Sequence, residues 1–350
     1  MSDFATRLIA WQKVHGRHDL PWQTPANQTA DPYAIWVSEI MLQQTQVTAV
    51  IGYYSKFMQR FPNISTLASA TQDEVLQHWS GLGYYSRARN LHNAAQTIMD
   101  DYSGQFPQDF NTIQTLSGIG RSTAAAIASF AFNQVQTILD GNVKRVLARH
   151  FVVEGWPSAP KVEKELWLLA EQLLPKQGMV AYTQGLMDLG ATLCTRSKPK
   201  CAACPLMNSC EAYKQQRVHA LPTPKPRKVI PEKNTTMLIF LRGDEVMLEK
   251  RPPTGIWGGL WSFPEIESGH DIATYAQNNF GISALAAKPL PMLSHAFTHF
   301  KLHIQPQPLQ VLKQQTSARE AGQIWLNIED AIGAAIPTPI RKILQSLLKS

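Results

Sequence analysis

Residues 113–132 read IQTLSGIGRSTAAAIASFAF, a short helical pattern followed by a Gly-x-Gly turn and an alanine-rich helical run. In such a turn the backbone amides of Gly118 to Gly120 approach an anion without obstruction by side chains, and the N-terminus of the next helix adds its positive dipole. The segment predicts a helix–hairpin–helix, which clamps a DNA backbone without reading its sequence. By itself it fits a plain helix–turn–helix packing corner equally well.

Helical patterns surround this segment. Apolar residues recur at spacings of three and four in Ile35–Tyr54, Ser86–Met99, Asn142–Phe151 and Val162–Leu174. Gly, Pro and Asp residues separate these runs, as is typical of helix boundaries. Residues 1–220 are therefore expected to form one all-α domain.

The second part of the chain has a different period. Four prolines in Leu221–Pro231 predict a stiff, basic linker over residues 221–233, which either contacts phosphates or is simply solvated. Strands are expected over Thr236–Arg242 and Glu245–Arg251 around a hairpin turn, then at Trp261–Phe263, Phe297–Ile304 and Gln323–Leu326, with a closing helix at Ile340–Leu348. Residues 234–350 thus predict an α+β domain, which makes the chain multidomain.

The overall charge and the N-terminus indicate the compartment. The net charge of +7 suits a polyanionic partner, although it also occurs in unrelated proteins. The N-terminus lacks the apolar core and cleavage site of a secretory signal, and no apolar stretch reaches the roughly 18 residues of a membrane span. A cytoplasmic protein without a membrane partner is expected.

All four cysteines fall in one short segment with the pattern Cys194-x6-Cys201-x2-Cys204-x5-Cys210. Four thiolates so close together form a compact cage for zinc or for a [4Fe–4S] cluster, and the spacing alone leaves both open. A metal that folds this loop would present Lys198 and Lys200 to a phosphate backbone.

Asp140 stands in front of a helical run, in ILDGNVKRVLAR at residues 138–149. The structural interpretation is that an Asp at this point caps the helix. The functional interpretation is a carboxylate that faces a sugar whose phosphates the hairpin holds, with Lys144 and Arg145 keeping it ionised.

Glu39 lies in WVSEIMLQQTQV at residues 36–47, where Glu39, Gln43 and Gln46 form a polar stripe at helical spacing. Uncharged Gln suits a groove that hydrogen-bonds bases, and apolar neighbours such as Trp36 would desolvate Glu39 and raise its pKa. Two carboxyl groups in different environments suit cleavage of a glycosidic bond, since one protonates the leaving group and the other stabilises the sugar cation.

Together these segments resemble the endonuclease III superfamily of DNA glycosylases over about residues 5–212. The superfamily spacing is met at all four cysteines, so the resemblance implies a [4Fe–4S] cluster. The superfamily hairpin Leu-Pro-Gly-Val-Gly appears as Leu116–Gly120, with Ser117 in place of proline. The residues implied to contact the DNA backbone are Gly118, Gly120, Arg121, Lys198 and Lys200.

Within that superfamily the chain resembles the adenine DNA glycosylases, the MutY family. The family segment SEVMLQQTQV appears as Ser38–Val47 with Ile40 as its one change, and Gly81–Asn90 matches almost completely. Ser122 occupies the position of a Schiff-base lysine in bifunctional relatives, which implies base removal without strand cleavage.

The resemblance also implies roles and a substrate. Glu39 would protonate adenine and then activate water, and Asp140 would stabilise or trap the sugar cation. Gln44 and Tyr84 would wedge into the base stack, and the other base-site residues are Trp22, Gln43, Ser122 and Gln184. The implied partner is double-stranded DNA with adenine opposite 8-oxoguanine or guanine, bound by a monomer, where a mispair makes base extraction less costly. His18, where the family has lysine, receives no role.

Residues 234–350 resemble the family's Nudix-like domain. Arg251–Pro264 resembles the approach to a Nudix box, but the acidic core that would bind Mg²⁺ is missing from Glu265–Gly281. The family's Phe-Ser-His loop for 8-oxoguanine appears as Phe297-Thr298-His299. Without the resemblance, these three residues fit a half-buried strand with Phe297 and His299 on one face.

Three other functions are compatible with parts of the sequence. A glycosylase for oxidised pyrimidines is disfavoured by Ser122 and by the extra domain. An iron–sulfur protein that binds lesions without chemistry leaves Glu39 and Asp140 unexplained. A nucleotide pyrophosphatase is disfavoured by the missing metal-binding glutamates.

Overall fold

The structure is a computed structural model that describes residues 3–25, 28–226, 229–267, 269–315 and 322–349. Its backbone separates into two compact units. Unit 1 comprises Met1–Ser69 and Asn90–Arg227, and unit 2 comprises Ala70–Arg89 and Lys228–Ser350. Across the described ranges, no helix combines the length and the apolar character that a bilayer crossing requires.

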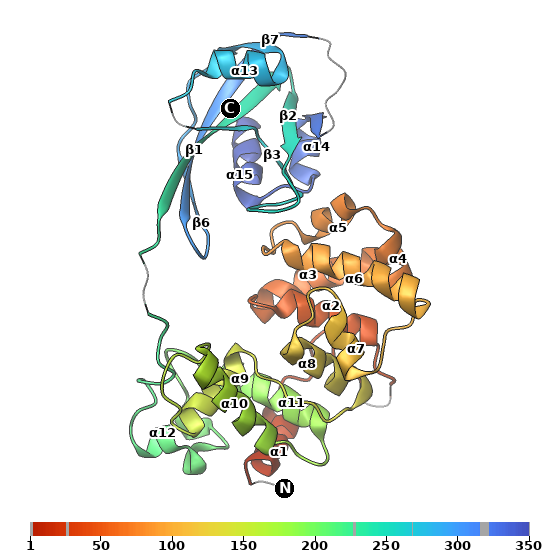
Figure 1. Ribbon diagram of the computed structural model, residues 1–350, viewed down its shortest axis with the longest axis vertical. Coiled ribbons are helices and arrows are strands. Elements are labelled where there is room, and N and C mark those ends of the chain that lie inside the picture. The colour runs from red at the N-terminus through yellow and green to blue at the C-terminus, as the bar shows by residue number, and fades with distance from the viewer. Residues whose placement is uncertain (1–2, 26–27, 227–228, 268, 316–321, 350) are drawn as a thin grey trace. The chain divides into compact units, whose positions relative to one another are not determined.

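Unit 1 is all-α (Figure 1). Its helices are α1 (Asp3–His15), α2 (Pro32–Leu42), α3 (Val47–Arg60), α4 (Ile64–Ser69), α6 (Ser86–Tyr102), α7 (Phe110–Thr115), α8 (Arg121–Phe132), α9 (Gly141–His150), α10 (Pro160–Gln172), α11 (Met179–Asp188) and α12 (Glu211–Lys214). A π-helical turn, η1 (Leu189–Leu193), and two 3₁₀ turns, η2 (Cys201–Ala203) and η3 (Met207–Ser209), connect α11 to α12. The helices expected after residues 86, 121, 142 and 162 are confirmed as α6, α8, α9 and α10.

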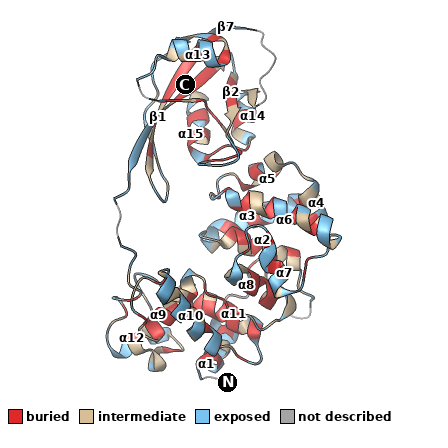
Figure 2. Cartoon of the chain, in the orientation of Figure 1, coloured by how far each residue is buried: buried red, intermediate tan, exposed pale blue. Residues whose placement is uncertain are grey.

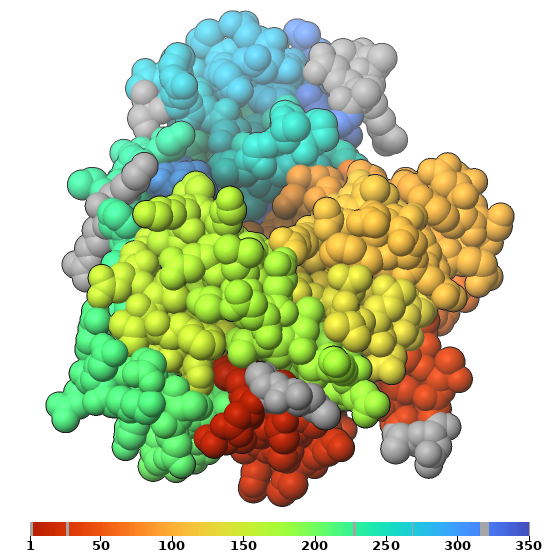
Figure 3. Space-filling model, turned by 60° about the horizontal axis from the view of Figure 1, so that its bottom comes forward, coloured from red at the N-terminus to blue at the C-terminus, as the bar shows by residue number. Residues whose placement is uncertain are grey.

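Helix α8 forms the centre of unit 1. Its residues Ala124 to Ser129 are all buried, and Figure 2 shows buried residues gathered along it. Small alanine side chains let α2, α7 and α11 approach this helix closely, and a helix that is apolar all round belongs in a core. Helix α1 packs on α11, and the N-terminal segment lies against the lime-coloured segment in Figure 3. The hairpin segment is therefore anchored in the core, not displayed on an isolated corner.

The single helical run expected over Ile35–Tyr54 is wrong in one respect. The structure has two helices there, because Gln43 leaves helical geometry with ψ 112° and Gln44 adopts a left-handed φ of +56°. Gln43 is thus the C-cap of α2, and Gln46 is the N-cap of α3. The expected stripe of Glu39, Gln43 and Gln46 on one helix does not exist.

Unit 2 contains a mixed sheet and the helices packed on it. Its elements are α5 (Gln72–Trp79), β1 (Glu232–Arg242), β2 (Glu245–Lys250), β3 (Trp261–Ser262), β4 (Glu265–Ile266), α13 (Ile272–Phe280), β5 (Ile282–Ala286), β6 (Leu293–Ala296), β7 (Lys301–Gln314), β8 (Gln323–Asn327), α14 (Ile328–Gly333) and α15 (Thr338–Leu347). The strand order is β3-β2-β1-β7-β5, with β4 paired to β1, β6 to β7 and β8 to β2. Strands β1 and β7 run parallel, and the other pairs are antiparallel. The expected α+β class is confirmed.

The centre of the sheet is covered on both faces. All four residues from Met237 to Phe240 in β1 are buried, as in a strand between two layers. Leu238 and Phe240 pack with Ala276 and Phe280 of α13. The expected hairpin of β1 and β2 is confirmed, with Gly243 at a left-handed φ of +58° in its turn.

Two features of unit 2 differ from the sequence expectation. Residues 297–300 do not continue β7 but form the turn between β6 and β7, closed by a hydrogen bond from Phe297 N to Phe300 O at 2.8 Å. The strand interpretation of Phe297 and His299 is therefore wrong. In addition, residues 70–89, expected within the helical domain, cluster with residues 228–350 through an ion pair of Asp73 with Lys250 and a hydrogen bond from Arg89 Nη1 to Gly258 O.

Candidate active site

Glu39 opens onto a cavity in unit 1. Helix α2 presents it, and that helix begins at Pro32 with Asp31 as its N-cap, whose side chain accepts a hydrogen bond from Tyr33 N at 2.9 Å. The cavity holds about 450 Å³, which lies in the ~300–1,000 Å³ range of small-ligand sites. Trp22 and Gln184 also line it, so three of the expected site residues meet at one cavity.

The environment of Glu39 favours its neutral form. Burial, and to a smaller extent the negative charge of Asp140, raises the pKa of Glu39 from 4.5 to about 8. A carboxyl group with such a pKa holds its proton at neutral pH and is able to donate it. The dependence on Asp140 also shows that these two groups, about 100 positions apart in the sequence, interact electrostatically.

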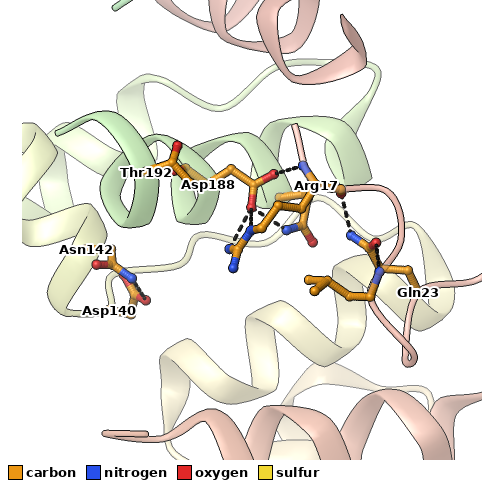
Figure 4. A network of polar contacts seen from close by, with 8 residues as sticks. Arg17, Gln23, Asp140, Asn142, Asp188 and Thr192 are labelled. Carbon is orange, nitrogen blue, oxygen red and sulfur yellow. Dashed lines mark hydrogen bonds and ion pairs between the residues drawn. The ribbon is translucent and has the colours of Figure 1, made fainter. Parts of the chain in front are cut away.

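Asp140 is both a helix cap and a member of this pair. Its Oδ1 accepts a hydrogen bond from Val143 N at 2.7 Å, so it caps α9 as the structural interpretation expected. Asn142 faces it at the start of α9 (Figure 4). Burial raises the pKa of Asp140, while the hydrogen bonds from Val143 and Asn142 and the charge of Arg145 act in the opposite direction. Within the described residues Asp140 is not part of the cavity wall.

The two cations expected to keep Asp140 ionised differ. Arg145 does act on Asp140, as the charge effect above shows. Lys144 instead forms an ion pair with Glu163 of α10 at 2.7 Å, so its charge is directed away from Asp140. That part of the expectation is wrong, because a residue next to Arg145 on a helix points about 100° away from it.

The hairpin between α7 and α8 has the backbone that the glycines predicted. Gly118 has a left-handed φ of +79°, and a Cβ there would lie 2.8 Å from Asn90 Cβ. Gly120 caps α8 without a side-chain bond, and a Cβ there would meet nothing within 4 Å. Gln43 Nε2 lies 3.4 Å from Gly118 O and 3.3 Å from Thr123 Oγ1, which links the end of α2 to the hairpin.

Arg121 and Ser122, which follow the hairpin, make contacts that the sequence did not predict. Arg121 is paired with Glu171 at 2.6 Å and stacks over the Trp167 ring at 3.9 Å, so its charge is already engaged by α10. Ser122 accepts a hydrogen bond from Leu139 N at 3.0 Å. Ser122 therefore supports the segment that carries Asp140.

The two expected wedge residues share an unusual backbone. Gln44 has φ +56° and Tyr84 has φ +49°, although neither is glycine. A non-glycine residue in the left-handed region costs free energy and is frequent at functional sites. Tyr84 is 46% exposed.

The base-sized cavity contains residues that the sequence analysis missed. Arg17 and His18 line it, and the fully buried Asp188 binds Arg17 (Figure 4). Asp188 also binds Gln184, another residue of the cavity wall. The sequence did contain a signal for Asp188, since a lone Asp in the apolar run LMDLG at residues 186–190 indicates a buried charge that has a partner. Its partner, 171 positions away, had no signal of its own.

The four cysteines line one cavity with apolar walls. Burial raises the pKa of Cys204 to about 12, and the other three thiols contribute in the same direction, so thiolates here need a positive partner. Arg149 supplies one contact, from Nη1 to Cys194 Sγ at 3.4 Å. Among the described residues, no three His, Cys, Asp or Glu side chains are grouped as ligands of a single metal ion.

The basic residues of this loop lie at the surface. Lys198 and Lys200 are both exposed, so their ammonium groups are accessible to a phosphate. Arg145 and Arg149 of α9 face inward and donate hydrogen bonds to Cys194 O, which ties the loop to the helix that begins after Asp140. The loop thus has an outer and an inner set of cations.

Unit 2 has an aromatic pocket of about 360 Å³. Tyr84, Phe297 and Thr298 line it, while His299 is exposed and does not belong to the described lining. The sequence analysis missed Trp257 and His295, whose ring centroids lie 5.4 Å and 4.7 Å from that of Phe297. The pocket brings an expected wedge residue and two residues of the expected lesion loop to one place.

Comparisons with known proteins match two separate parts of the chain to two families. Residues 37–172 match the HhH-GPD superfamily of base excision DNA repair proteins, and residues 235–346 match the NUDIX domain. The adenine DNA glycosylase of Buchnera aphidicola (subspecies Acyrthosiphon pisum) is 37% identical over 99% of this chain and 98% of its own length. The adenine DNA glycosylase of Mus musculus is 35% identical over 98% of this chain and 77% of its own.

Solved structures match the helical part of the chain. A thermostable thymine-DNA glycosylase superposes with a TM-score of 0.54 at 30% identity, covering 61% of this chain and 95% of that one. A non-covalent endonuclease III–DNA complex has the same fold, with a TM-score of 0.50 at 20% identity over 61% of this chain and 94% of that one.

Proposed function

The chain belongs to the adenine DNA glycosylase family of the HhH-GPD superfamily, and from this premise we propose that it hydrolyses the N-glycosidic bond of adenine mispaired with 8-oxoguanine or guanine in duplex DNA. The observation that carries the proposal is a pair of unlike carboxyl groups: Glu39 lies at the cavity wall with its pKa raised to about 8, and Asp140 is close enough to contribute to that rise. One acid holds a proton to donate, and the other has bonds that stabilise its anion.

In the proposed reaction adenine leaves the base stack and enters the cavity. Glu39 donates its proton to the ring, which turns adenine into a neutral leaving group as the glycosidic bond breaks. The Asp140 carboxylate stabilises the positive charge that develops on the sugar. Glu39, now an anion, accepts a proton from the water that adds to the sugar, which returns both groups to their starting states.

The proposed enzyme releases the base without breaking the DNA strand. Strand cleavage through an imine needs an amine near the sugar, and Ser122 supplies a hydroxyl that is bonded to Leu139 N. Gly118 and Gly120 hold the DNA backbone through their amides at the start of α8, with Lys198 and Lys200 as further contacts. Gln44 and Tyr84 enter the stack beside the extracted base.

The four cysteines are proposed to hold one [4Fe–4S] cluster. Four sulfur donors around one apolar cavity are the usual ligands of such a cluster, and the Arg149 charge at Cys194 Sγ offsets negative charge there. The cluster would supply a rigid fold for the loop that carries Lys198 and Lys200. Iron and sulfide analysis with a visible absorbance spectrum tests this assignment.

The aromatic pocket of unit 2 is proposed to read 8-oxoguanine. Phe297 offers a ring for stacking and Thr298 a hydroxyl, while the exposed His299 lies outside the described lining. If so, Phe297→Ala lowers adenine release from A:8-oxoguanine more than from A:G, by about 10-fold or more, since stacking on an aromatic ring contributes ~1–3 kcal/mol per base. Equal loss on both duplexes would argue against a lesion-reading pocket.

A set of duplexes tests the proposed function as a whole. The protein, as a monomer, is expected to release adenine opposite 8-oxoguanine and guanine, to leave an alkali-labile but unbroken strand, and to spare adenine opposite thymine. Duplexes with an oxidised pyrimidine or with thymine opposite guanine test the rival substrates. Release from either of these, without adenine release, would replace the proposed substrate.

A further inference from the structure

Asp188 is a buried acid that contacts two residues of the cavity wall, Arg17 and Gln184. It is 0% exposed at the end of α11 and accepts four contacts. Arg17 donates hydrogen bonds to Asp188 from its backbone amide at 2.9 Å and from its Nε at 2.7 Å, and its Nη2 forms an ion pair at 2.7 Å (Figure 4). Gln184 donates a hydrogen bond to Asp188 from its Nε2 at 2.8 Å. A buried carboxylate that is held by several donors at once has a fixed orientation, because a rotation would break its ion pair in a place that water does not reach.

The backbone next to Arg17 is shaped for this contact. A Cβ at Gly16 would lie 3.0 Å from Asp188 Oδ2 and 2.5 Å from Gln12 O. Only a residue without a side chain lets the backbone pass close enough for the Arg17 amide to reach the acid. This contact joins the loop after α1 to α11, two segments that both line the cavity.

Asp188 also determines how the Gln184 amide is turned. Gln184 and Asp188 lie four residues apart on α11, on one face of the helix. An ionised carboxylate only accepts hydrogen bonds, so the amide must turn its NH₂ group toward Asp188. Its carbonyl oxygen Oε1 has no hydrogen-bond partner among the described residues, and Gln184 lines the cavity. The atom left for a bound base is therefore an acceptor.

We propose that Asp188 is a positioning residue that fixes Gln184 as a hydrogen-bond acceptor and thereby selects a purine with a 6-amino group. The proposal rests on the proposed function of the cavity and extends it to base selectivity. An amino group at the 6-position donates to Oε1, whereas a 6-keto oxygen, as in guanine or hypoxanthine, meets a second acceptor. A site built for a hydrogen bond rejects such analogues because its own polar atom is left unpaired.

The test compares two bases that differ only at the 6-position. Single-turnover release is measured from full-length protein on duplexes with adenine or unsubstituted purine opposite 8-oxoguanine. In Asp188→Asn the neighbouring amide no longer dictates the orientation of Gln184, so the adenine-to-purine rate ratio is expected to fall about 10-fold, as for the loss of one hydrogen bond. Gln184→Leu keeps the ion pair of Asp188 with Arg17, and it is expected to lower the ratio equally.

A double variant separates orientation from simple loss of an acid. In Gln184→Glu combined with Asp188→Asn the carboxylate moves to position 184, where both of its oxygens are acceptors, so the side chain presents an acceptor to the cavity whichever way it turns. The ratio is expected to return to within about 3-fold of the unmodified protein, as a restored hydrogen bond predicts. Ser129→Ala is the matched control. It removes the buried hydrogen bond at 3.0 Å between Ser129 of α8 and Thr183 of α11. If disturbed packing of α11 were the only effect, both release rates should fall equally and their ratio should not change.

The outcomes are distinguishable. An unchanged ratio in Asp188→Asn and Gln184→Leu, or no recovery in the folded double variant, overturns the role of Asp188. A ratio that falls as far in Ser129→Ala reduces Asp188 to a packing role. If the unmodified protein releases neither base, the proposed function itself fails, and the inference fails with it.

Discussion

The middle of α2 and the start of α9 each carry one carboxyl group of the candidate site, and burial raises the pKa of both, but only the group at α9 has contacts that oppose this rise. Glu39 on α2 lies at the cavity wall, where burial and the nearby negative charge both raise its pKa. Asp140 in front of α9 is buried too, but amide hydrogen bonds and the Arg145 charge counteract the effect of burial. A helix interior offers its side chains no free amides, whereas a helix N-terminus offers several, so the position on the helix separates the two roles.

The largest effect on adenine release is expected when Glu39 of α2 is replaced by a residue without an acidic proton. Glu39→Gln keeps the size and polarity but has no proton to donate, so adenine release is expected to fall by about 10³-fold, within the range of general acid catalysis. Binding to the same duplex, measured by gel shift, should change less than about 3-fold since no backbone contact is lost. Turnover close to that of the unmodified protein would remove Glu39 from the mechanism.

Loss of the Asp140 charge in front of α9 is expected to lower adenine release strongly, but less than loss of the Glu39 proton. Asp140→Asn retains an oxygen for the Val143 amide, so the helix cap stays, while the negative charge is lost. Release should fall by about 100-fold, as for other electrostatic groups that act on the transition state. Asp271→Asn, the same change at the cap of α13, is the matched control and should leave release unchanged. Full activity with weaker DNA binding in Asp140→Asn would favour a protein that binds without chemistry.

The pH dependence separates the two groups without mutation of either. Release that needs protonated Glu39 should decrease about 10-fold per unit above about pH 8. Between pH 4.5 and about 8 the folded protein holds a proton at Glu39 that the unfolded chain has lost, so its stability should fall as pH rises through this window. Thermal unfolding of Glu39→Gln should lack this decline. An identical pH profile of stability in both proteins would show that Glu39 is not perturbed.

The smallest effect is expected from shifting α9 without changing either acid. A Cβ at Gly190 would lie 2.5 Å from Asn142 Cβ, so Gly190→Ala should push the start of α9 away and cost about 1–3 kcal/mol of stability. Release should fall several-fold, while a decline at alkaline pH stays, because burial of Glu39 on α2 is the larger cause of its raised pKa. Gly52→Ala in α3 is the matched control, since its Cβ would meet nothing within 4 Å. Equal effects of both changes on unfolding and on release would contradict the close packing at Gly190.

Several features were predictable because they depend on neighbouring residues. The turn at Gly118 and Gly120, the cap at Asp140 and the hairpin at Gly243 follow from local backbone preferences, and the structure has all three. The break after Leu42 was missed because the apolar spacing continues through it, and only the backbone of Gln43 and Gln44 ends the helix. Local patterns state which residues favour a helix, but not where packing interrupts it.

By itself the sequence determined the two-part organisation, the hairpin and the clustering of four cysteines, since each depends on residues close together in the chain. Only the tertiary structure decided which charges meet. It brought Asp140 near Glu39 and paired Lys144 with Glu163. It also paired Asp188 with Arg17, which lies far away in the sequence. The physical reason is that the pKa and orientation of a buried group depend on every charge and hydrogen bond around it in space, and most of these come from distant parts of the chain.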